Sequence, residues 1–305
     1  MFTGFPEVHY TDFHVVRIYD VKAPVVNDSA EVDSPILLSI FNEFQQELDE
    51  ARAKLAPNSP PLTVVGSNRK IPDDATSAQR RTDPITEVRA DTILAYLKGL
   101  PTRTDDQRLS PDGVLLVWCE THGLGPDLVL SHKDEKGNPE ILKRNDILAT
   151  LDAIPHRLVI LVTENCWGGN PGVVPAPVLN PQGFWRQLYF GHSGVVDIMS
   201  SGDKQKAYVV DGAVFTRAFL KAFDLQKDAI TGGSPDKFVT WDKFFNNAIV
   251  PLTHIEYQDA VARLRSLEQP ANQDNPKSQL LKNMIDQKTQ DPQWFNPEKV
   301  RVLPP

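Results

Sequence analysis

The sequence feature that most constrains the fold is an apolar run at residues 158–162, which ends abruptly and is followed by a cysteine. The run contains only leucine, valine and isoleucine. A short, unbroken apolar segment of this kind is typical of a strand that is buried on both faces of a parallel sheet. Cys166 follows shortly after the run, and two glycines come after Trp167. Because open α/β sheets bind ligands at the carboxyl ends of their strands, we expect Cys166 to lie at such an edge.

A second apolar segment, at residues 114–118, has a similar ending. It is followed by His122 and Gly123. His122 and Cys166 lie 44 residues apart, which leaves room for one helical crossover between two adjacent parallel strands. We therefore expect the two strands to bring both side chains to the same edge of the sheet, within reach of each other.

These two side chains are the groups that nucleophilic thiol catalysis requires. A thiol attacks as the thiolate, and an unperturbed cysteine is mostly protonated at neutral pH. The imidazole of His122 can accept the proton of Cys166 and later protonate a leaving amine. The backbone N–H groups of Gly123 and Cys166 can stabilise the oxyanion of a tetrahedral intermediate. The sequence therefore predicts a catalytic dyad of Cys166 and His122, with an oxyanion hole beside it.

The remaining pattern alternates strands with helices. Strands are expected at residues 13–19, 62–65, 113–119, 157–163 and 194–199, and helices at 34–55, 86–98, 145–154 and 214–223. A hairpin is expected at residues 127–137, a long loop at 167–193, and a helix after the N-cap Thr240. This order predicts an α/β fold with a mostly parallel central sheet and helices on both faces. We expect one domain at residues 1–251 and a helical extension at 252–305, which packs on the same domain.

Composition excludes several classes of protein. The net charge is −8 and no Lys/Arg run is present, which argues against a nucleic-acid-binding protein. No apolar run approaches the ~20 residues of a membrane helix, and the N-terminus does not have the pattern of a signal peptide. Cys119 and Cys166 are too few for a disulfide framework. We therefore expect a cytoplasmic protein in which Cys119 is a buried small hydrophobic residue.

Together these motifs resemble the caspase-like cysteine peptidases, the group of caspases, metacaspases and their bacterial relatives. The resemblance lies in a strand before His122 and Gly123, a strand before Glu164, Asn165 and Cys166, and two later stretches at residues 198–205 and 212–220. It covers about residues 10–250. It implies a caspase-like α/β/α sandwich and an endopeptidase that forms an acyl-enzyme intermediate. It also implies a protein or peptide substrate, with action on a few protein targets in defence or cell death.

The resemblance also suggests a specificity. In metacaspases, the acid before the cysteine and another acid after the next strand pair with a basic P1 side chain. Glu164 and Asp203 occupy these positions here, which implies cleavage after Arg or Lys. An ordinary loop carboxylate remains an alternative for Glu164, and a turn-forming aspartate for Asp203.

Two other functions remain open. Trp167 replaces the His, Gln or Arg that usually follows the cysteine, which leaves open a catalytically inactive module that binds a peptide or partner protein. A nucleotide- or flavin-binding domain is the weaker alternative, because no glycine-rich phosphate loop follows the first strand at residues 20–24.

The other titratable groups give weaker signals. His192 is the rival candidate for the base, whereas His132 is expected in a turn and His156 in solvent. No set of His and Cys residues has the spacing of a zinc site, so neither a metal nor a cofactor is expected. Some metacaspases require calcium, and the acidic pair of Asp73 and Asp74 leaves calcium activation open.

Overall fold

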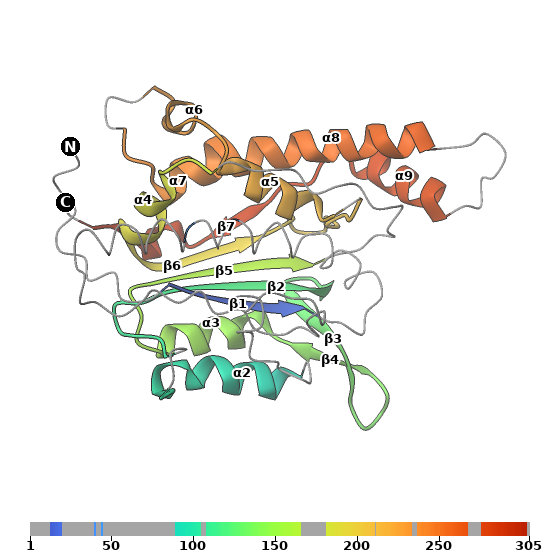
Figure 1. Cartoon of the computed structure of the whole chain (residues 1–305). Coiled ribbons are helices and arrows are strands. Elements are labelled where there is room, and N and C mark those ends of the chain that lie inside the picture. The colour runs from blue at the N-terminus through green and yellow to red at the C-terminus, as the bar shows by residue number, and fades with distance from the viewer. Residues whose placement is uncertain are drawn as a thin grey trace, which may run out of the picture.

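The protein is an α/β fold built on a mixed sheet with helices (Figure 1). The computed structural model describes residues 13–19, 40, 44, 89–104, 108–165, 181–210, 212–233, 237–267 and 276–303. The strands are β1 (Phe13–Tyr19), β2 (Val114–Leu124), β3 (Asp127–Lys133), β4 (Pro139–Leu142), β5 (Leu158–Asn165), β6 (His192–Met199), β7 (Gln293–Phe295) and β8 (Val300–Val302). The helices are α2 (Ala90–Gly99), α3 (Arg144–Ala153), α4 (Trp185–Phe190), α5 (Val214–Ala222), α6 (Lys227–Thr231), α7 (Trp241–Phe244), α8 (Val250–Leu267) and α9 (Pro276–Gln287). Shorter helical segments are η2 (Leu100–Thr102), η3 (Phe245–Ile249) and η4 (Pro297–Lys299).

The centre of the sheet is parallel, as the apolar runs predict. β1, β2, β5 and β6 are neighbours in that order, and every pairing among them is parallel. Their arrows therefore point to the same side of the molecule in Figure 1. The strands that were predicted at residues 13–19, 157–163 and 194–199 are confirmed as β1, β5 and β6.

The outer strands make the sheet mixed rather than mostly parallel. β2 does not end near residue 119: it continues to Leu124, and its last residues pair with β3 in an antiparallel hairpin. β3 pairs in turn with β4. The hairpin predicted at residues 127–137 is therefore only part of a three-stranded antiparallel unit, because β3 pairs with β2 along one edge and with β4 along the other.

The C-terminal residues contribute strands as well as helices. The helical extension predicted at 252–305 contains α8 and α9. β7 and β8 were not predicted, and both pair antiparallel with β6. Residues 252–305 thus include two strands of the central sheet, and α8 runs across the expected boundary at residue 251.

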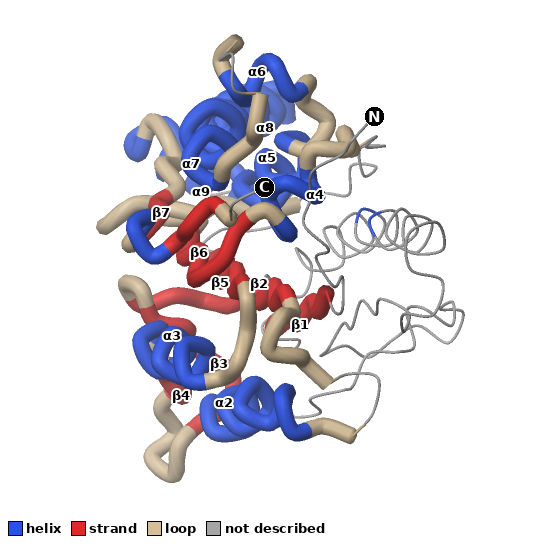
Figure 2. The backbone as a smooth tube through the Cα atoms, turned by 90° about the vertical axis from the view of Figure 1, so that its left-hand side faces the viewer, coloured by secondary structure: helices blue, strands red, loops and turns tan. Residues whose placement is uncertain are grey.

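Helices cover both faces of the parallel strands (Figure 2). One face packs against α2 and α3, and Leu115 and Val117 of β2 belong to that core. The other face packs against α4, α5 and α7, and Leu116 and Trp118 belong to this second core. Successive side chains of a strand point to opposite faces. A strand between two helical layers must therefore be apolar at nearly every position, which explains the continuous apolar runs.

The aromatic stretch after the predicted nucleophile folds as a helix. Residues 185–190 form α4, so the prediction of one continuous loop at 167–193 is wrong for this part. Trp185 and Tyr189 are fully buried, and the Tyr189 ring stacks on Phe223 with centroids 6.4 Å apart. Burial of several large aromatic side chains stabilises a helix that is too short to be stable alone.

Most of the other predicted helices are present. α5 matches the helix predicted at 214–223, and the Thr240 side chain accepts a hydrogen bond from the Lys243 N–H at the start of α7. α3 begins at Arg144 and buries Ile147 and Leu151. The predicted helix at 34–55 and strand at 62–65 lie outside the described residues, apart from two buried helical residues, Ile40 and Phe44.

Candidate functional site

The carboxyl edge of the parallel strands gathers most of the predicted site residues that the structure describes. β2 brings Glu120 and His122 to this edge, and β5 brings Glu164. β6 leads into the loop that contains Asp203. The parallel pairing of these three strands places their ends side by side, as the sequence predicted.

His122 lies within a strand rather than in a loop. It follows the last residue of β2 that pairs with β5, and its register partner is Val129 of β3. The hydroxyl of Thr121 donates to the His122 carbonyl at 2.9 Å. The turn from β2 to β3 contains Gly125 at a φ of 62°, a conformation that favours glycine. His122 is half-buried, so a strand backbone fixes its position while part of the residue stays accessible.

Cys166 lies outside the described residues, and so does its N–H in the predicted oxyanion hole. The last described pair between β2 and β5 joins Thr121 to Asn165. His122 and Cys166 are the next residues of the two segments in the sequence. The dyad itself therefore stays a prediction, although the described register reaches the residue before each member.

Glu164 has a partner from its own chain. It is fully buried, and the hydroxyl of Thr216 on α5 donates to its Oε2 atom. Glu120 is its register partner on β2 and is equally buried. A basic P1 side chain that binds Glu164 would have to share this carboxylate with Thr216. The proposed role of Glu164 in specificity stays a prediction.

Asp203 is exposed in a turn after β6. The next residue, Lys204, has a φ of 62°. The C-terminal segment holds the rest of this loop in place: Gln205 Nε2 donates to Asp291 Oδ2 at 2.6 Å, and the Tyr208 N–H donates to Gln290 Oε1 at 3.1 Å. The loop thus presents an exposed carboxylate from a backbone that residues after α9 fix.

The opposite face of the same strands carries a buried ion pair that the sequence analysis missed. Arg144, the first residue of α3, donates from Nη1 to Asp197 Oδ2 of β6 at 3.0 Å, and its Nη2 donates to Oδ1. Its Nε also donates to Thr163 Oγ1 of β5 at 3.3 Å. Burial raises the pKa of Asp197, and the Arg144 guanidinium opposes that rise. The one sequence signal for this pair is an aspartate inside an otherwise apolar strand.

Cys119 is confirmed as a buried small hydrophobic residue. It is fully buried, and this burial raises the pKa of its thiol to about 12. A thiol with this pKa is inert at neutral pH. The structure therefore provides no nucleophile at Cys119.

His192 is not a suitable base for the predicted site. It is the first residue of β6 and so lies at the amino end of that strand, opposite the candidate edge. Its ring is buried, and Nδ1 lies 2.9 Å from the Gln187 carbonyl oxygen, which a ring N–H at that atom can satisfy. Burial also lowers the pKa of His192. His132 lies in β3 rather than in a turn, whereas His156 is half-buried with its Nδ1 atom 2.7 Å from the Ile154 carbonyl oxygen.

The described residues show neither a metal-binding group nor a membrane-spanning helix. The described ranges contain no group of three or more His, Cys, Asp or Glu residues that could hold a metal ion. Asp73 and Asp74, which left calcium activation open, lie outside these ranges. Among the helices described, none is both long and apolar enough to cross a bilayer.

No protein-family model matches the sequence, and a search of the curated proteins finds no match.

Proposed function

We propose that the protein is a caspase-like cysteine endopeptidase in which Cys166 is the nucleophile and His122 is the base. The observation that carries the proposal is the parallel register of β2 and β5, which is described as far as Thr121 and Asn165. The next residue of each segment is the histidine on one side and the cysteine on the other. A crossover through α3 joins the two strands, as the spacing of the two motifs predicts.

The proposed reaction uses these groups in a fixed order. His122 accepts the thiol proton, and the Cys166 thiolate attacks the carbonyl carbon of the scissile bond. The N–H groups of Gly123 and Cys166 stabilise the oxyanion that forms. His122 then protonates the leaving amine, which leaves a thioester between Cys166 and the acyl part of the substrate. Water, activated by His122, hydrolyses the thioester and releases the acid.

We propose that the substrate is a protein or peptide that is cut after Arg or Lys. Asp203 supports this proposal, because it is an exposed carboxylate in the loop after β6. Glu164 is the second acid, and its bond from Thr216 restrains it. By analogy with the caspase-like group, we propose that the enzyme cuts a few protein targets in defence or cell death. By the same analogy we propose that it works in a reducing cytoplasm, which keeps the thiol free.

Labelling with an electrophilic peptide that ends in arginine tests this function. We expect one adduct per chain at Cys166, located by mass spectrometry, and no adduct in Cys166→Ala. Cys119→Ala is the matched control and is expected to label like the wild type, because Cys119 is buried. Absence of any adduct in the folded wild type would contradict the peptidase and favour an inactive peptide-binding module.

A further inference from the structure

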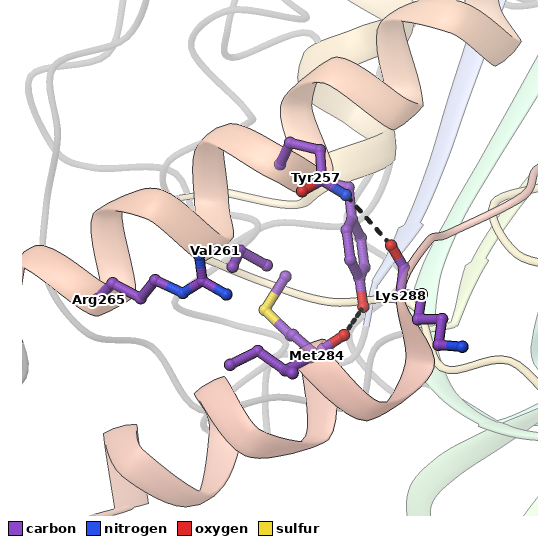
Figure 3. A pocket seen from close by; sticks show the side chains of 7 residues that line it. Tyr257, Val261, Arg265, Met284 and Lys288 are labelled. Atoms are coloured by element: carbon purple, nitrogen blue, oxygen red, sulfur yellow. Dashed lines mark hydrogen bonds between the residues drawn. The ribbon is translucent and has the colours of Figure 1, made fainter.

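A groove opens between α8 and the end of α9 (Figure 3). Its volume is about 240 Å³. The side chains of Tyr257, Val261 and Met284 form its floor, and all three residues are buried. At its rim stand Ile285, which is 43 % exposed, and the two cations Arg265 and Lys288. A hollow with an apolar floor and cations at its rim suits an apolar group that carries acids beside it.

The two walls of the groove are bonded to each other. The Tyr257 hydroxyl donates to the Met284 carbonyl at 2.7 Å, which links α8 to α9. The side-chain amide of Gln258 donates to the Lys288 carbonyl at 3.2 Å. Figure 3 shows both bonds at one end of the groove. These bonds hold the helices in place, so the hollow is already formed before a ligand binds.

The rim has the opposite charge to the protein as a whole. Residues 257–288, which span the lining of the groove, contain five Lys or Arg residues and four Asp or Glu residues, whereas the whole chain has a net charge of −8. Arg265 and Lys288 are both exposed, and neither forms an ion pair within the part of the chain that the structure describes. Two cations at the rim of the groove favour an anionic partner.

The backbone at Lys288 has a conformation that is uncommon for a residue with a Cβ atom. Lys288 has a φ of 72°, in the left-handed region, and its N–H donates to the Met284 carbonyl at 2.9 Å. A helix that ends in this way usually has glycine at the left-handed position, because a Cβ atom is disfavoured there. Glycine would fit the backbone better but would remove a cation from the rim. Conformations that cost stability are often retained for function.

We propose that this groove is a docking site for an acidic, apolar segment of a partner protein. One apolar side chain of the segment fills the hollow over Met284, and acidic residues on either side of it pair with Arg265 and Lys288. A protein segment is favoured over a small molecule because the hollow is smaller than the roughly 300–1,000 Å³ that small-molecule sites usually occupy. The far end of α8 and most of α9 extend beyond the carboxyl edge of the sheet in Figure 1. A partner bound here would therefore lie at the same end of the molecule as the candidate site.

Selection from a random peptide library tests the proposal without relying on catalysis. A library of twelve-residue peptides on phage is selected against the full chain as Cys166→Ala, so that no peptide is cut. We expect the selected peptides to combine Asp or Glu with a neighbouring Leu, Ile, Phe or Met. Peptides without acids, or selection of no peptide, would overturn the proposal.

Three variants then locate the site. With the best selected peptide, we expect Arg265→Gln and Lys288→Gly each to lower the affinity about three-fold, and both together about ten-fold, as for exposed charge pairs. Lys282→Gln, on an exposed residue of α9 outside the groove, is the matched control and should change the affinity less than about two-fold. Lys288→Gly relieves the left-handed backbone, so its melting temperature should stay the same or rise. Weaker binding by this variant therefore cannot result from misfolding.

Two results would refute the groove as the partner site. One is equal affinity of the selected peptide for the wild type and for Lys288→Gly. The other is a stable dimer in sedimentation that Ile285→Glu disrupts, because the groove would then hold a second copy of this chain. Neither result depends on arginine-directed labelling of Cys166, so failure of this proposal and failure of the peptidase proposal are distinguishable.

Discussion

Replacing Asp197 with asparagine removes the negative charge of the buried ion pair while nearly conserving the shape of the side chain. The side chains of Arg144 and Asp197 are only 6 % and 4 % exposed, so the remaining guanidinium would be charged and buried without a counterion. Coulomb's law gives about 4 kcal/mol for unit charges about 4 Å apart at an effective dielectric constant of about 20. Removal of one partner from a buried pair typically costs about 3–5 kcal/mol. We therefore expect Asp197→Asn to lower the free energy of unfolding by about 3–5 kcal/mol.

Urea unfolding followed by circular dichroism measures this loss. Two controls define its origin. Lys237→Gln breaks an exposed pair with Asp228, whose side chains are 67 % and 68 % exposed, and should cost less than about 1 kcal/mol. Arg144→Met combined with Asp197→Leu removes both charges and should cost less than Asp197→Asn alone. A loss below about 1 kcal/mol for Asp197→Asn, or a double variant that loses as much stability as Asp197→Asn or more, would refute this reasoning.

Three further predictions concern Cys119, His192 and Gly194. Burial raises the pKa of Cys119 to about 12, so in Cys166→Ala Ellman's reagent at pH 8 should not modify Cys119 in the folded chain but should do so in guanidinium; modification of the folded Cys166→Ala variant at the rate of a free thiol would contradict this. Burial lowers the pKa of His192, so below about pH 6.5 the unfolded chain binds a proton that the folded chain resists. The free energy of unfolding should then fall as the pH decreases, by up to about 1.4 kcal/mol per pH unit. Urea titrations at pH 7 and pH 5 should show a smaller loss between the two pH values for His192→Asn than for the wild type. A Cβ atom at Gly194, which has a φ of 106°, would lie 1.9 Å from the Lys299 carbonyl oxygen, so Gly194→Ala should cost at least about 3 kcal/mol in urea unfolding. Gly137→Ala, at a φ of 82° with open space around it, is the control and should cost about 1–2 kcal/mol. Equal losses of stability for Gly194→Ala and Gly137→Ala would contradict a contribution from the contact with Lys299, because backbone strain alone would then explain both.

The parts of the fold with a strong local pattern could be predicted from the sequence. β5 and β6 follow apolar runs, and α8 and α9 follow a helical, charge-rich pattern. The end of β2 could not be predicted, because His122 and Gly123 continue a strand only through their pairing with β3. β7 and β8 have three residues each, which is too short for any periodicity to be visible.

The polar contacts around the candidate site depend on residues that are far apart in the sequence. Arg144 and Asp197 are separated by 53 residues, and Thr216 and Glu164 by 52. Only the folded sheet brings them together. For His122 the sequence did predict the edge of the sheet, because a strand followed by a polar motif is a local signal. The isolated aspartate within the apolar strand at residues 194–199 was also a local signal, and it marked the buried pair.

The most direct test of the central claim is the rate at which iodoacetamide alkylates Cys166 between pH 5 and pH 9. A thiol that shares a proton with an imidazole forms the thiolate well below the ordinary thiol pKa of about 8.5. We expect the wild-type rate to rise at a pH well below this value, and His122→Ala to shift the profile back to about 8.5. Overlapping profiles for the wild type and His122→Ala would show that the two side chains do not act together, and would contradict the proposed dyad.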